Sequence, residues 1–503
     1  MRGTIAVVIL MLVGAGIALG LRSQFQPRVG KVSPVPAGDV ELAWIHTTTN
    51  AQTWERFVAG VHEAARQLPD MEVDDSAAFL DQTVSVPEVS IGFRDQPNRI
   101  RIRWYKISSE VSTREWVAKL AERDPPPLAF IGGGSSDRAI ELAKALHDQE
   151  EWKGSKPLLC LTTATADWAD ADLPREGGNE NAVKLIDIYP KRSFRFCFTN
   201  SAMARAVLDF VWQTPSLRPH GPGGPPAALA HLGALSPWNG IAVAPLLSYE
   251  TPPQAHILSW MDDPYSADLA LRFRELFRPG AGLGLECTAV EVSEIRYSVG
   301  TFTSVNPRET GSTELILAEG TPARGRKFLL VLPAATQPAR RMIRAFAADS
   351  PMIGRSMVAV TGDGISFNTV YRDGEVAWPT RELSIPLVFF AHQNPVAWAE
   401  DDPTPITNRT STDEFLLFAD IVRTLGRHIR QPGPITDADE LLQRMRKDPF
   451  FDTDGERRAG QGEHVVVVRP LIGEDDRVAK DTHFEVYTRS GGKRWELIKL
   501  LTK

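Results

Sequence analysis

The feature that most constrains this chain is the repeated alternation of short apolar runs with amphipathic stretches of helical period. Residues 40–49, 99–108, 128–131 and 157–166 each have the composition of a strand, and helical patterns follow the first three of these runs. This alternation is typical of a doubly wound α/β sheet, in which helices connect parallel strands. The sequence therefore predicts the α/β class for its first part.

The same alternation restarts after a polar, Gly-, Asn- and Asp-rich segment at residues 167–181. We expect the apolar run at 194–200 to begin a second lobe and the Pro- and Gly-rich segment at 215–226 to be a surface insertion. A chain of 503 residues also exceeds what one hydrophobic core usually supports. We predict two Rossmann-like lobes joined by a hinge of several crossing strands. The expected divisions are an anchor or signal at 1–25, a linker at 26–39, a first lobe at 40–190 and 383–464, and a second lobe at 191–382 and 465–503.

Composition sets limits on the partners. The chain is 43% hydrophobic and 24% charged, which is close to the average for soluble globular domains. Its net charge of -7 and pI near 5.9 provide no broad basic field. We therefore expect no nucleic-acid partner.

The N-terminal sequence predicts an export signal. Residues 4–21 form a run of 18 uncharged residues between Arg2 and Arg22, and such a helix would be about 27 Å long, near the thickness of a bilayer core. The run predicts either a cleaved secretory signal or an uncleaved transmembrane anchor, with a buried helix as the alternative. We favour the anchor, because Ala18-Leu19-Gly20 resembles a cleavage site only loosely. The expected location is the periplasm or another extracytoplasmic space, with tethering to the inner membrane if the anchor is kept.

The three cysteines predict neither a disulfide framework nor a metal site. Cys160, Cys197 and Cys287 are too few and too scattered for a disulfide scaffold or a zinc site. Cys160 and Cys197 each lie in an apolar run, so we expect buried, inert thiols there.

Motifs of catalysis and metal binding are also missing from the sequence. It contains no GxSxG, no HExxH and no clustered Cys and His, and His46, His231 and His392 are isolated. Residues 452–455 resemble a fragment of a calcium loop without its full ligand spacing, so we expect a turn. We predict no catalytic residue, no metal ligand and no cofactor, although a triad assembled from distant positions stays open.

The best candidate for a binding site is a glycine-rich turn between a strand and a helix. Gly132, Gly133 and Gly134 let a ligand approach the backbone, and Ser135 and Ser136 add hydroxyl groups at the start of a helix, whose N-terminus attracts anions. A tight turn with a capping serine is the alternative.

The strand after this helix ends in three threonines. Thr162, Thr163 and Thr165 lie where parallel strands of an open α/β sheet present ligand-binding loops. We expect this loop and the glycine loop to face one crevice. The alternative is that the threonines reflect only the usual composition of strands.

Four segments resemble a known family in their order along the chain. These are FIGGGSSDRAIELAKAL with PLLCLTTATAD, then FRFCFTNSAMARAVLDFVW, then HILSWMDDPYSADLALRFRELF, and then FLLVLPAATQPARRMIRAF with VAVTGDG. They resemble the type 1 periplasmic binding proteins, in particular the branched-chain amino acid (Leu/Ile/Val) receptor group of ABC transporters. Ser266 stands where that family usually has glycine, which leaves the ligand open.

The resemblance implies a two-lobed receptor that closes on a small ligand by hinge motion and does no chemistry on it. The positions that match the ligand contacts of the family are Ser135, Ser136, Ala164, Thr165, Tyr265, Asp363 and Trp54. By this resemblance the serines, Ala164 and Thr165 would hold a carboxylate and Asp363 an ammonium group. Tyr265 and Trp54 would supply aromatic walls.

We therefore expect an exported solute-binding receptor for a small polar molecule, an amino acid or a similar compound. Its partners would be this ligand, an ABC transporter permease and, through the N-terminal segment, the membrane; the alternative to transport is sensing. Two other classes stay open: an enzyme on a bilobal α/β scaffold, and a membrane-anchored scaffold or sensor that binds a protein.

Overall fold

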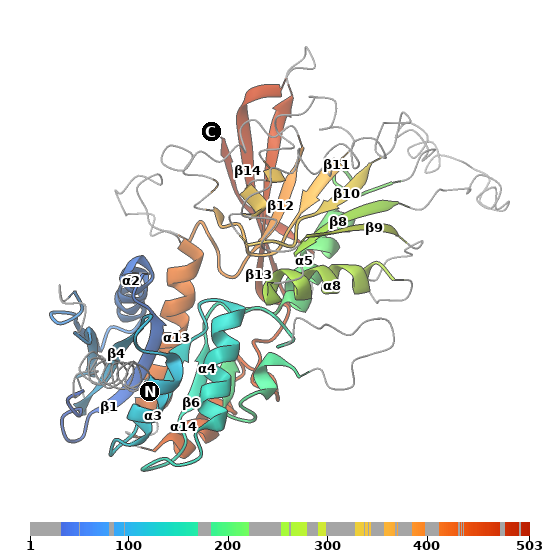
Figure 1. Cartoon of the computed structure of the whole chain (residues 1–503). Helices are drawn as coiled ribbons and strands as arrows, with labels where there is room; N and C mark the ends of the chain where they lie inside the picture. The colour runs from blue at the N-terminus through green and yellow to red at the C-terminus, as the bar shows by residue number, and fades with distance from the viewer. Residues whose placement is uncertain are drawn as a thin grey trace, which may run out of the picture.

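The chain forms two lobes, one above the other in Figure 1, each built around one sheet. The computed structural model describes residues 32–49, 51–79, 85–94, 96–169, 183–220, 253–260, 263–278, 290–297, 327–335, 338–340, 342–343, 357–367, 370, 385–397, 412–430, 433, 435, 437–472, 478–491 and 494–502.

The first lobe contains a seven-stranded sheet in the order β2-β3-β4-β1-β5-β6-β7. Its strands are β1 (Val40–Thr47), β2 (Met71–Asp74), β3 (Glu88–Phe93), β4 (Gln96–Ile107), β5 (Ala129–Gly132), β6 (Leu158–Leu161) and β7 (Ser193–Arg195). β4, β1, β5, β6 and β7 are parallel, and β2 and β3 add an antiparallel edge. Numbered along the chain, the parallel strands have the order 2-1-3-4-5. In doubly wound sheets ligands bind where this order reverses, which here is between β1 and β5.

Helices cover both faces of the first sheet. They are α2 (Ala51–Gln67), α3 (Thr113–Ala121), α4 (Ser136–Asp148), α13 (Thr412–Arg430) and α14 (Ala438–Met445). Successive side chains of β1 alternate between the two faces: Leu42 and Trp44 pack in the core under α2 and α13, whereas Ala43 and Ile45 pack in the core under α3 and α4. α3 starts where the sequence provides a cap, since Ser112 and Glu115 form a reciprocal capping box there.

The second lobe contains an eight-stranded sheet in the order β15-β14-β13-β12-β11-β10-β8-β9. Its strands are β8 (Gln254–Trp260), β9 (Glu291–Tyr297), β10 (Phe328–Val331), β11 (Met357–Val360), β12 (Leu387–Ala391), β13 (Gln461–Ile472), β14 (Val478–Ser490) and β15 (Glu496–Thr502). The strands from β8 to β12 are parallel and repeat the 2-1-3-4-5 order of the first lobe. β13, β14 and β15 extend the sheet in antiparallel pairing. The order reverses between β8 and β10.

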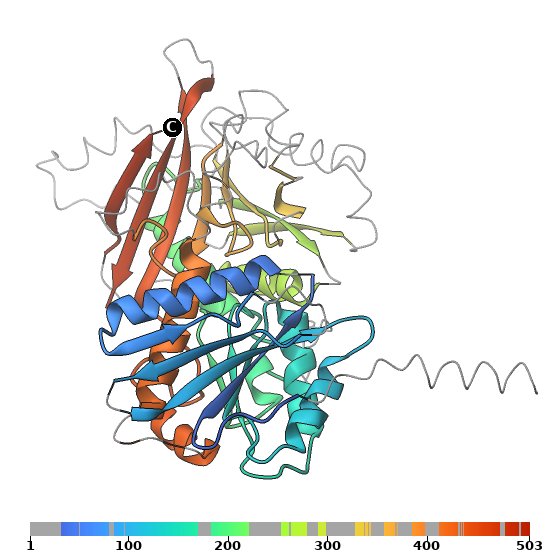
Figure 2. The same cartoon turned by 90° about the vertical axis from the view of Figure 1, so that its left-hand side faces the viewer.

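Two helices of the second lobe lie beside the junction with the first. α5 (Asn200–Gln213) is capped by Thr199, and α8 (Pro264–Leu276) is capped by Asp263 with a proline in its first turn. Both helices pack in one core with β8, β10 and β11. Figures 1 and 2 show α2, α4 and α8 at the level where the lobes meet.

The described elements imply three passages of the chain between the lobes, after β7, after β12 and before β13. Arg457 belongs to the last passage, and its guanidinium lies 4.0 Å from the ring centre of Phe198 in the first passage and 5.2 Å from that of Phe450. Burial lowers the pKa of Arg457 to about 10. The predicted hinge therefore has a packed aromatic and cationic centre.

The structure confirms two doubly wound α/β lobes but corrects the lobe boundaries. β7 pairs with β6 in the first sheet, although the sequence placed residues from 191 onward in the second lobe. β12 pairs with β11 and β13 in the second sheet, although residues 383–464 were assigned to the first lobe, and the boundary at 464 falls within β13. An apolar run has the same periodicity whichever sheet it joins, so its pattern does not predict the strands with which it pairs.

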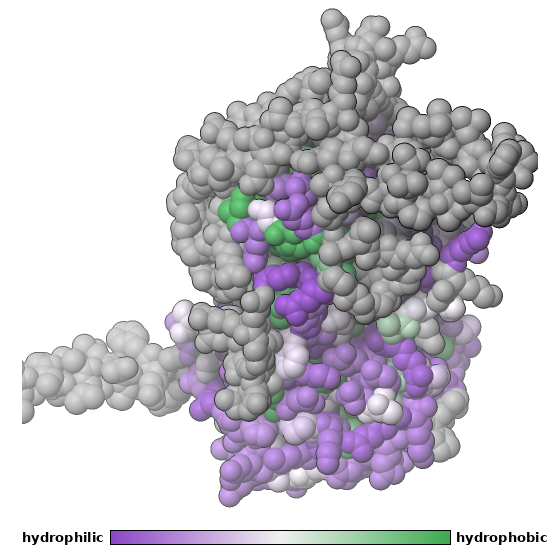
Figure 3. Space-filling model, turned by 90° about the vertical axis from the view of Figure 1, so that its right-hand side faces the viewer, coloured by the Kyte–Doolittle hydropathy of each residue, from purple (hydrophilic) through white to green (hydrophobic). Residues whose placement is uncertain are grey.

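Other sequence predictions have mixed outcomes. Cys160 and Cys197 are buried free thiols, and burial raises the pKa of each to about 12. Cys287 and the predicted signal or anchor at residues 4–21 lie outside the described residues. In the part of the chain that the structure describes, no helix is long and apolar enough to cross a membrane. Figure 3 shows the face of the first lobe on the right-hand side of Figure 1, and the described residues on this face are mainly hydrophilic.

Candidate functional site

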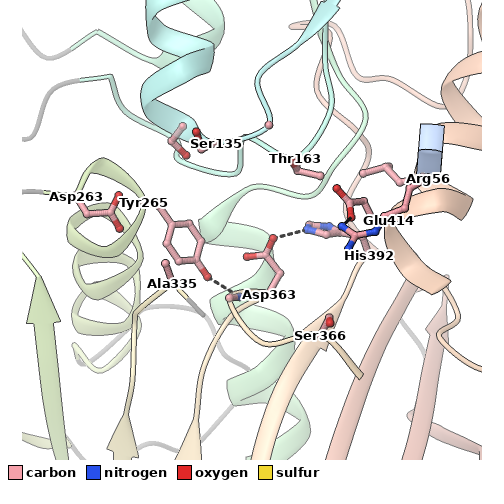
Figure 4. A pocket seen from close by; sticks show the side chains of 14 residues that line it. Arg56, Ser135, Thr163, Asp263, Tyr265, Ala335, Asp363, Ser366, His392 and Glu414 are labelled. Atoms are coloured by element: carbon pink, nitrogen blue, oxygen red, sulfur yellow. Dashed lines mark hydrogen bonds and ion pairs between the residues drawn. The ribbon is translucent and has the colours of Figure 1, made fainter. Parts of the chain in front are cut away.

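A cavity of about 460 Å³ lies between the two lobes. The first lobe lines it with Arg56, Gly134, Ser135, Ser136, Thr163, Glu414 and Leu417, and the second with Asp263, Tyr265, Ala335, Asp363, Gly364, Ser366 and His392. Most of these residues follow the carboxyl ends of parallel strands, with those after β8 and β10 on either side of the point where the strand order reverses. Figure 4 shows side chains of both lobes converging on it.

The first-lobe wall is the start of α4. Ser135 has extended backbone, is exposed and makes no side-chain cap bond, so its hydroxyl faces the cavity without a role in the helix. Ser136 is buried, and its Oγ accepts a hydrogen bond of 3.2 Å from the backbone N–H of Ala166. Gly133 has φ of +78°, and a Cβ there would lie 2.9 Å from Cβ of Ala139, so this turn requires glycine. The wall presents hydroxyls and a helix N-terminus, both of which suit an anion.

The second-lobe wall centres on a carboxylate held by a histidine. Nδ1 of His392 accepts a 3.2 Å hydrogen bond from the backbone N–H of Phe198, so the ring carries its proton on Nε2. Nε2 therefore donates to Oδ2 of Asp363, at 2.8 Å. The other oxygen, Oδ1, is buried and has no hydrogen-bond partner in the described structure. A buried carboxylate oxygen without a partner is costly, so this wall suits a ligand that brings a cation or a donor.

Tyr265 lies between two carboxylates. Its hydroxyl accepts a hydrogen bond of 3.0 Å from the backbone N–H of Gly364. Burial raises the pKa of Tyr265 well above its usual value, and the charge of Asp363, a hydrogen bond to the Asp363 side chain and the charge of Asp263 raise it further. The phenol therefore keeps its proton and remains a donor.

An ion pair from α2 and α13 closes one end of the cavity. Nη1 of Arg56 lies 2.6 Å from Oε2 of Glu414, and both side chains are about three-quarters buried. Arg56 is the one guanidinium among the described lining residues, whereas Asp263, Asp363 and Glu414 supply carboxylates. The cavity is therefore acidic on the side of the second lobe.

The structure brings together four of the seven predicted site residues. Ser135, Ser136, Tyr265 and Asp363 line the cavity, and the predicted convergence of the glycine and threonine loops is present because Thr163 lines it too. Thr162 instead donates to the carbonyl oxygen of Gly132, at 3.1 Å, and so fixes the two loops together.

Three predicted residues do not reach the cavity. Trp54 is 2% exposed, and its ring lies 5.0 Å from that of Trp44 while its Nε1 donates to the carbonyl oxygen of Ala78, at 2.8 Å. It points to the core because it lies on the apolar stripe of α2. Ala164 and Thr165 are buried beneath the loop, where the Thr165 carbonyl accepts from the backbone N–H of Asn200, at 2.7 Å.

Sequence reasoning missed several lining residues. Arg56 lies two positions after Trp54, on the polar side of the same helix, and Glu414 lies in α13, where the sequence predicted no site residue. His392 was interpreted as an isolated polar residue. The available signal was its position at the carboxyl end of an apolar strand, the same signal that pointed to Thr163.

A second polar cluster joins the lobes beside the cavity. Oδ2 of Asp268 on α8 accepts from the backbone N–H of Asp167, at 2.8 Å, and from Nδ2 of Asn200, at 2.9 Å. Arg272 lies 3.1 Å from Asp268 and 3.4 Å from Asp167, and its guanidinium covers the Trp168 ring. Burial and the charge of Asp167 raise the pKa of Asp268 to about 7. This cluster fastens α8 to the loop after β6.

The cavity also contains the residue types of a hydrolase triad, namely Ser366, His392 and Asp363. Both ring nitrogens of His392 are engaged, one by the backbone N–H of Phe198 and the other by Asp363. A general base needs a ring nitrogen directed at the nucleophile, so His392 cannot serve Ser366 in this arrangement. Among the described residues no three His, Cys, Asp or Glu side chains are placed to hold a metal ion.

Solved structures resemble the chain along nearly its whole length. A leucine-, isoleucine-, valine-, threonine- and alanine-binding protein from Brucella ovis, in a closed conformation, has 11% identity and a TM-score of 0.50, with 93% of this chain and 95% of that chain covered. An ABC-type branched-chain amino acid transporter from Rhodopseudomonas palustris CGA009 has 13% identity and a TM-score of 0.46, with 92% and 96% covered. A solute-binding protein of an ABC transporter from R. palustris, in complex with benzoate, has 14% identity and a TM-score of 0.44, with 92% and 96% covered.

No family model matches the sequence, and no curated protein does. The similarity to the Brucella ovis protein spans both lobes, so the chain has the fold of the type 1 periplasmic binding proteins. The resemblance predicted from the four sequence segments is confirmed at the level of the fold. At 11% identity the likeness carries no information about the ligand.

Proposed function

We propose that this chain is a solute-binding receptor whose lobes close on a small zwitterion, an amino acid or a close analogue. The observation that carries the proposal is the pairing of two unlike walls across one cavity. The start of α4, with Ser135, suits a carboxylate, and Asp363, with a buried unpartnered oxygen, suits an ammonium group.

The hydrogen bonds around Asp363 support the same reading. His392 accepts from the backbone N–H of Phe198 and donates to Oδ2 of Asp363, so it orients this carboxylate toward the cavity. Tyr265 stays protonated because it is buried beside Asp363, so its hydroxyl is a hydrogen-bond donor in this wall. An ammonium group placed against Asp363 would gain a charge-assisted hydrogen bond and satisfy the unpartnered oxygen.

Ligand binding would favour the closed state because the two walls belong to different lobes. A ligand shifts a conformational equilibrium only through contacts that differ between the states, and contacts to both walls at once exist only when the lobes are together. The cavity would hold its ligand and release it unchanged, since His392 has no ring nitrogen for proton transfer to Ser366.

The cellular role we propose is capture outside the cytoplasm, either for delivery to an ABC transporter permease or for sensing. The neighbours named above support this role by their descriptions as binding or transporter proteins. Export and tethering rest on residues 4–21 of the sequence.

The test is thermal unfolding of the purified chain with a panel of amino acids, their amides, des-amino acids and amines. A ligand at 100 times its Kd stabilises the native state by about 2.7 kcal/mol. We expect stabilisation by at least one amino acid, and loss of at least tenfold in affinity in Asp363→Asn. The control is Glu72→Gln, which removes an exposed carboxylate of the first lobe that lies 3.6 Å from Arg94 and does not line the cavity. This variant should bind with unchanged affinity. Stabilisation by amines or acids alone, or equal affinity in Asp363→Asn, would contradict the zwitterion.

A further inference from the structure

A second cavity of about 250 Å³ lies within the first lobe, behind the loop that separates it from the interlobe cavity. His46 and Thr47 line it at the end of β1, and Gly133, Gly134 and Ser135 line it after β5. β1 and β5 are the neighbours between which the strand order of this lobe reverses, the usual place for ligands in doubly wound sheets. The proposed function does not use this cavity.

A buried hydroxyl without a partner lines this second cavity. Thr113 is 1% exposed, and its Oγ1 has no hydrogen-bond partner in the described structure. Leaving a hydroxyl buried and unpaired costs free energy, and such groups in native proteins call for an explanation. Thr113 is also the first residue of α3, so the cavity meets the N-termini of α3 and α4. A bound group that accepts hydrogen bonds would satisfy the hydroxyl at a place that two helix dipoles make favourable for an anion.

The other polar side chains of the cavity also supply donors. Nδ1 of His46 accepts from the backbone N–H of Thr47, at 2.9 Å, so its Nε2 carries the proton. Burial lowers the pKa of His46, which keeps the ring neutral and fixes this arrangement. Arg138 provides a guanidinium, and its salt bridge of 2.8 Å to Glu141 is half exposed and therefore weak.

No described residue that lines the cavity carries a carboxylate, in contrast with the three carboxylates of the interlobe cavity. The remaining wall is apolar and consists of Ile45, Ile107 and Leu142. Donors at one side and aliphatic side chains at the other match a small molecule with an anionic head and a short apolar group.

We propose that this cavity is a binding site for a small aliphatic monocarboxylate, separate from the interlobe site. The carboxylate accepts from Thr113, Arg138 and His46, and the alkyl group contacts the three aliphatic side chains. A volume of about 250 Å³ suits a carboxylate with a short alkyl group and is too small for a large ligand. The two sites share Gly134 and Ser135, yet Asp363 contributes only to the interlobe site.

The test uses isobutyrate as the probe and isobutyramide, its uncharged isostere, as the matched ligand. Binding to the full chain is followed by saturation-transfer NMR and by thermal unfolding in a buffer without carboxylate. We expect isobutyrate to bind and isobutyramide to bind at least tenfold more weakly, because hydrogen bonds to a charged group are about twice as strong as neutral ones.

Thr113→Val is the decisive variant. It keeps the shape of the side chain and removes only a hydroxyl that has no partner, so the unliganded protein should unfold at the same temperature or slightly higher. The affinity for isobutyrate should fall about tenfold or more. Arg138→Gln should weaken it as well, whereas Arg114→Gln, an exposed arginine of α3, should leave it unchanged.

Three results would overturn the proposal: no binding of isobutyrate, equal binding of isobutyramide, or unchanged affinity in Thr113→Val. Asp363→Asn separates the two sites, since it should leave isobutyrate binding intact. If Asp363→Asn abolishes isobutyrate binding while Thr113→Val does not, the carboxylate occupies the interlobe cavity and the second site is refuted. If amino acids fail to bind but isobutyrate binds and depends on Thr113, the proposed zwitterion fails and this site stands.

Discussion

Two residues on one turn of α2 should separate stability from binding. Trp54 points into the core of the first lobe and Arg56 into the interlobe cavity. Replacement of each residue therefore tests where the boundary between core and site lies. The substitutions are Trp54→Ala, Trp54→Phe and Arg56→Gln.

The expected effect of Trp54 substitution follows from its contacts. It is 2% exposed, its ring lies 5.6 Å from those of Phe57 and Trp104, and its Nε1 donates to the carbonyl of Ala78. Truncation of a buried tryptophan to alanine costs about 3–5 kcal/mol. Trp54→Phe keeps an aromatic ring but leaves the buried carbonyl oxygen of Ala78 without its donor, at a cost of about 1–3 kcal/mol.

The expected effect of Arg56→Gln is the reverse. Its ion pair with Glu414 is partly exposed, and such pairs contribute about 0–1 kcal/mol to stability. The substitution removes the guanidinium and leaves Glu414 uncompensated at the cavity, so the affinity for a zwitterion should fall about fivefold to tenfold, equivalent to about 1 to 1.4 kcal/mol.

The assay is equilibrium unfolding in urea followed by far-UV circular dichroism, with calorimetric titration of the amino acid that binds. We expect both Trp54 variants to lose stability with affinity unchanged while they remain folded. A Trp54→Phe variant with wild-type stability and weakened binding would refute the assignment of Trp54 to the core. It would restore the sequence prediction of an aromatic wall at this position.

Three further predictions concern the junction of the lobes. Burial raises the pKa of Asp268 from its unfolded value to about 7, so the stability that Asp268 contributes is present below about pH 4 and is lost as pH rises to about 7. Asp268→Asn should therefore flatten the decline in the free energy of unfolding between about pH 4 and pH 7 in urea titrations. Gly364→Ala places a Cβ 2.1 Å from the backbone oxygen of Ala334, so the two loops that line the cavity must move apart. Ligand affinity measured by calorimetry should then fall at least tenfold, and wild-type affinity would contradict the need for glycine at this position. His392→Phe removes the donor to Asp363 and should weaken binding more than His392→Gln; equal affinities would show that the hydrogen bond has no part in binding.

The sequence predicted the architecture because its signals were local. The alternation of runs that became β1, α2, β4, α3, β5 and α4 is set by side-chain periodicity, which folding preserved. β2 and β3 were missed because they are short, and β3 has buried residues on both faces without a polar alternation. β7 and β12 belong to different sheets, and the sheet that each joins depends on pairing with segments far away in the sequence. Side-chain periodicity carries no information about that pairing.

The site was predictable in part for the same reason. Ser135 and Thr163 follow strands, and the carboxyl ends of parallel strands lie at one edge of a sheet. Trp54 was misplaced because the direction of a helical side chain is set by the sheet that the helix covers. His392 and Asp363 meet only because β11 and β12 are adjacent, a relation between two strands that neither segment encodes alone.

The most direct test of the account is small-angle X-ray scattering of the chain and of Asp363→Asn, each with and without a saturating amino acid. The account predicts that the radius of gyration of the wild-type chain decreases when the ligand binds and that Asp363→Asn shows no decrease at the same concentration. An unchanged radius in the saturated wild-type chain, or an equal decrease in Asp363→Asn, would contradict closure of the two lobes on a ligand held by Asp363.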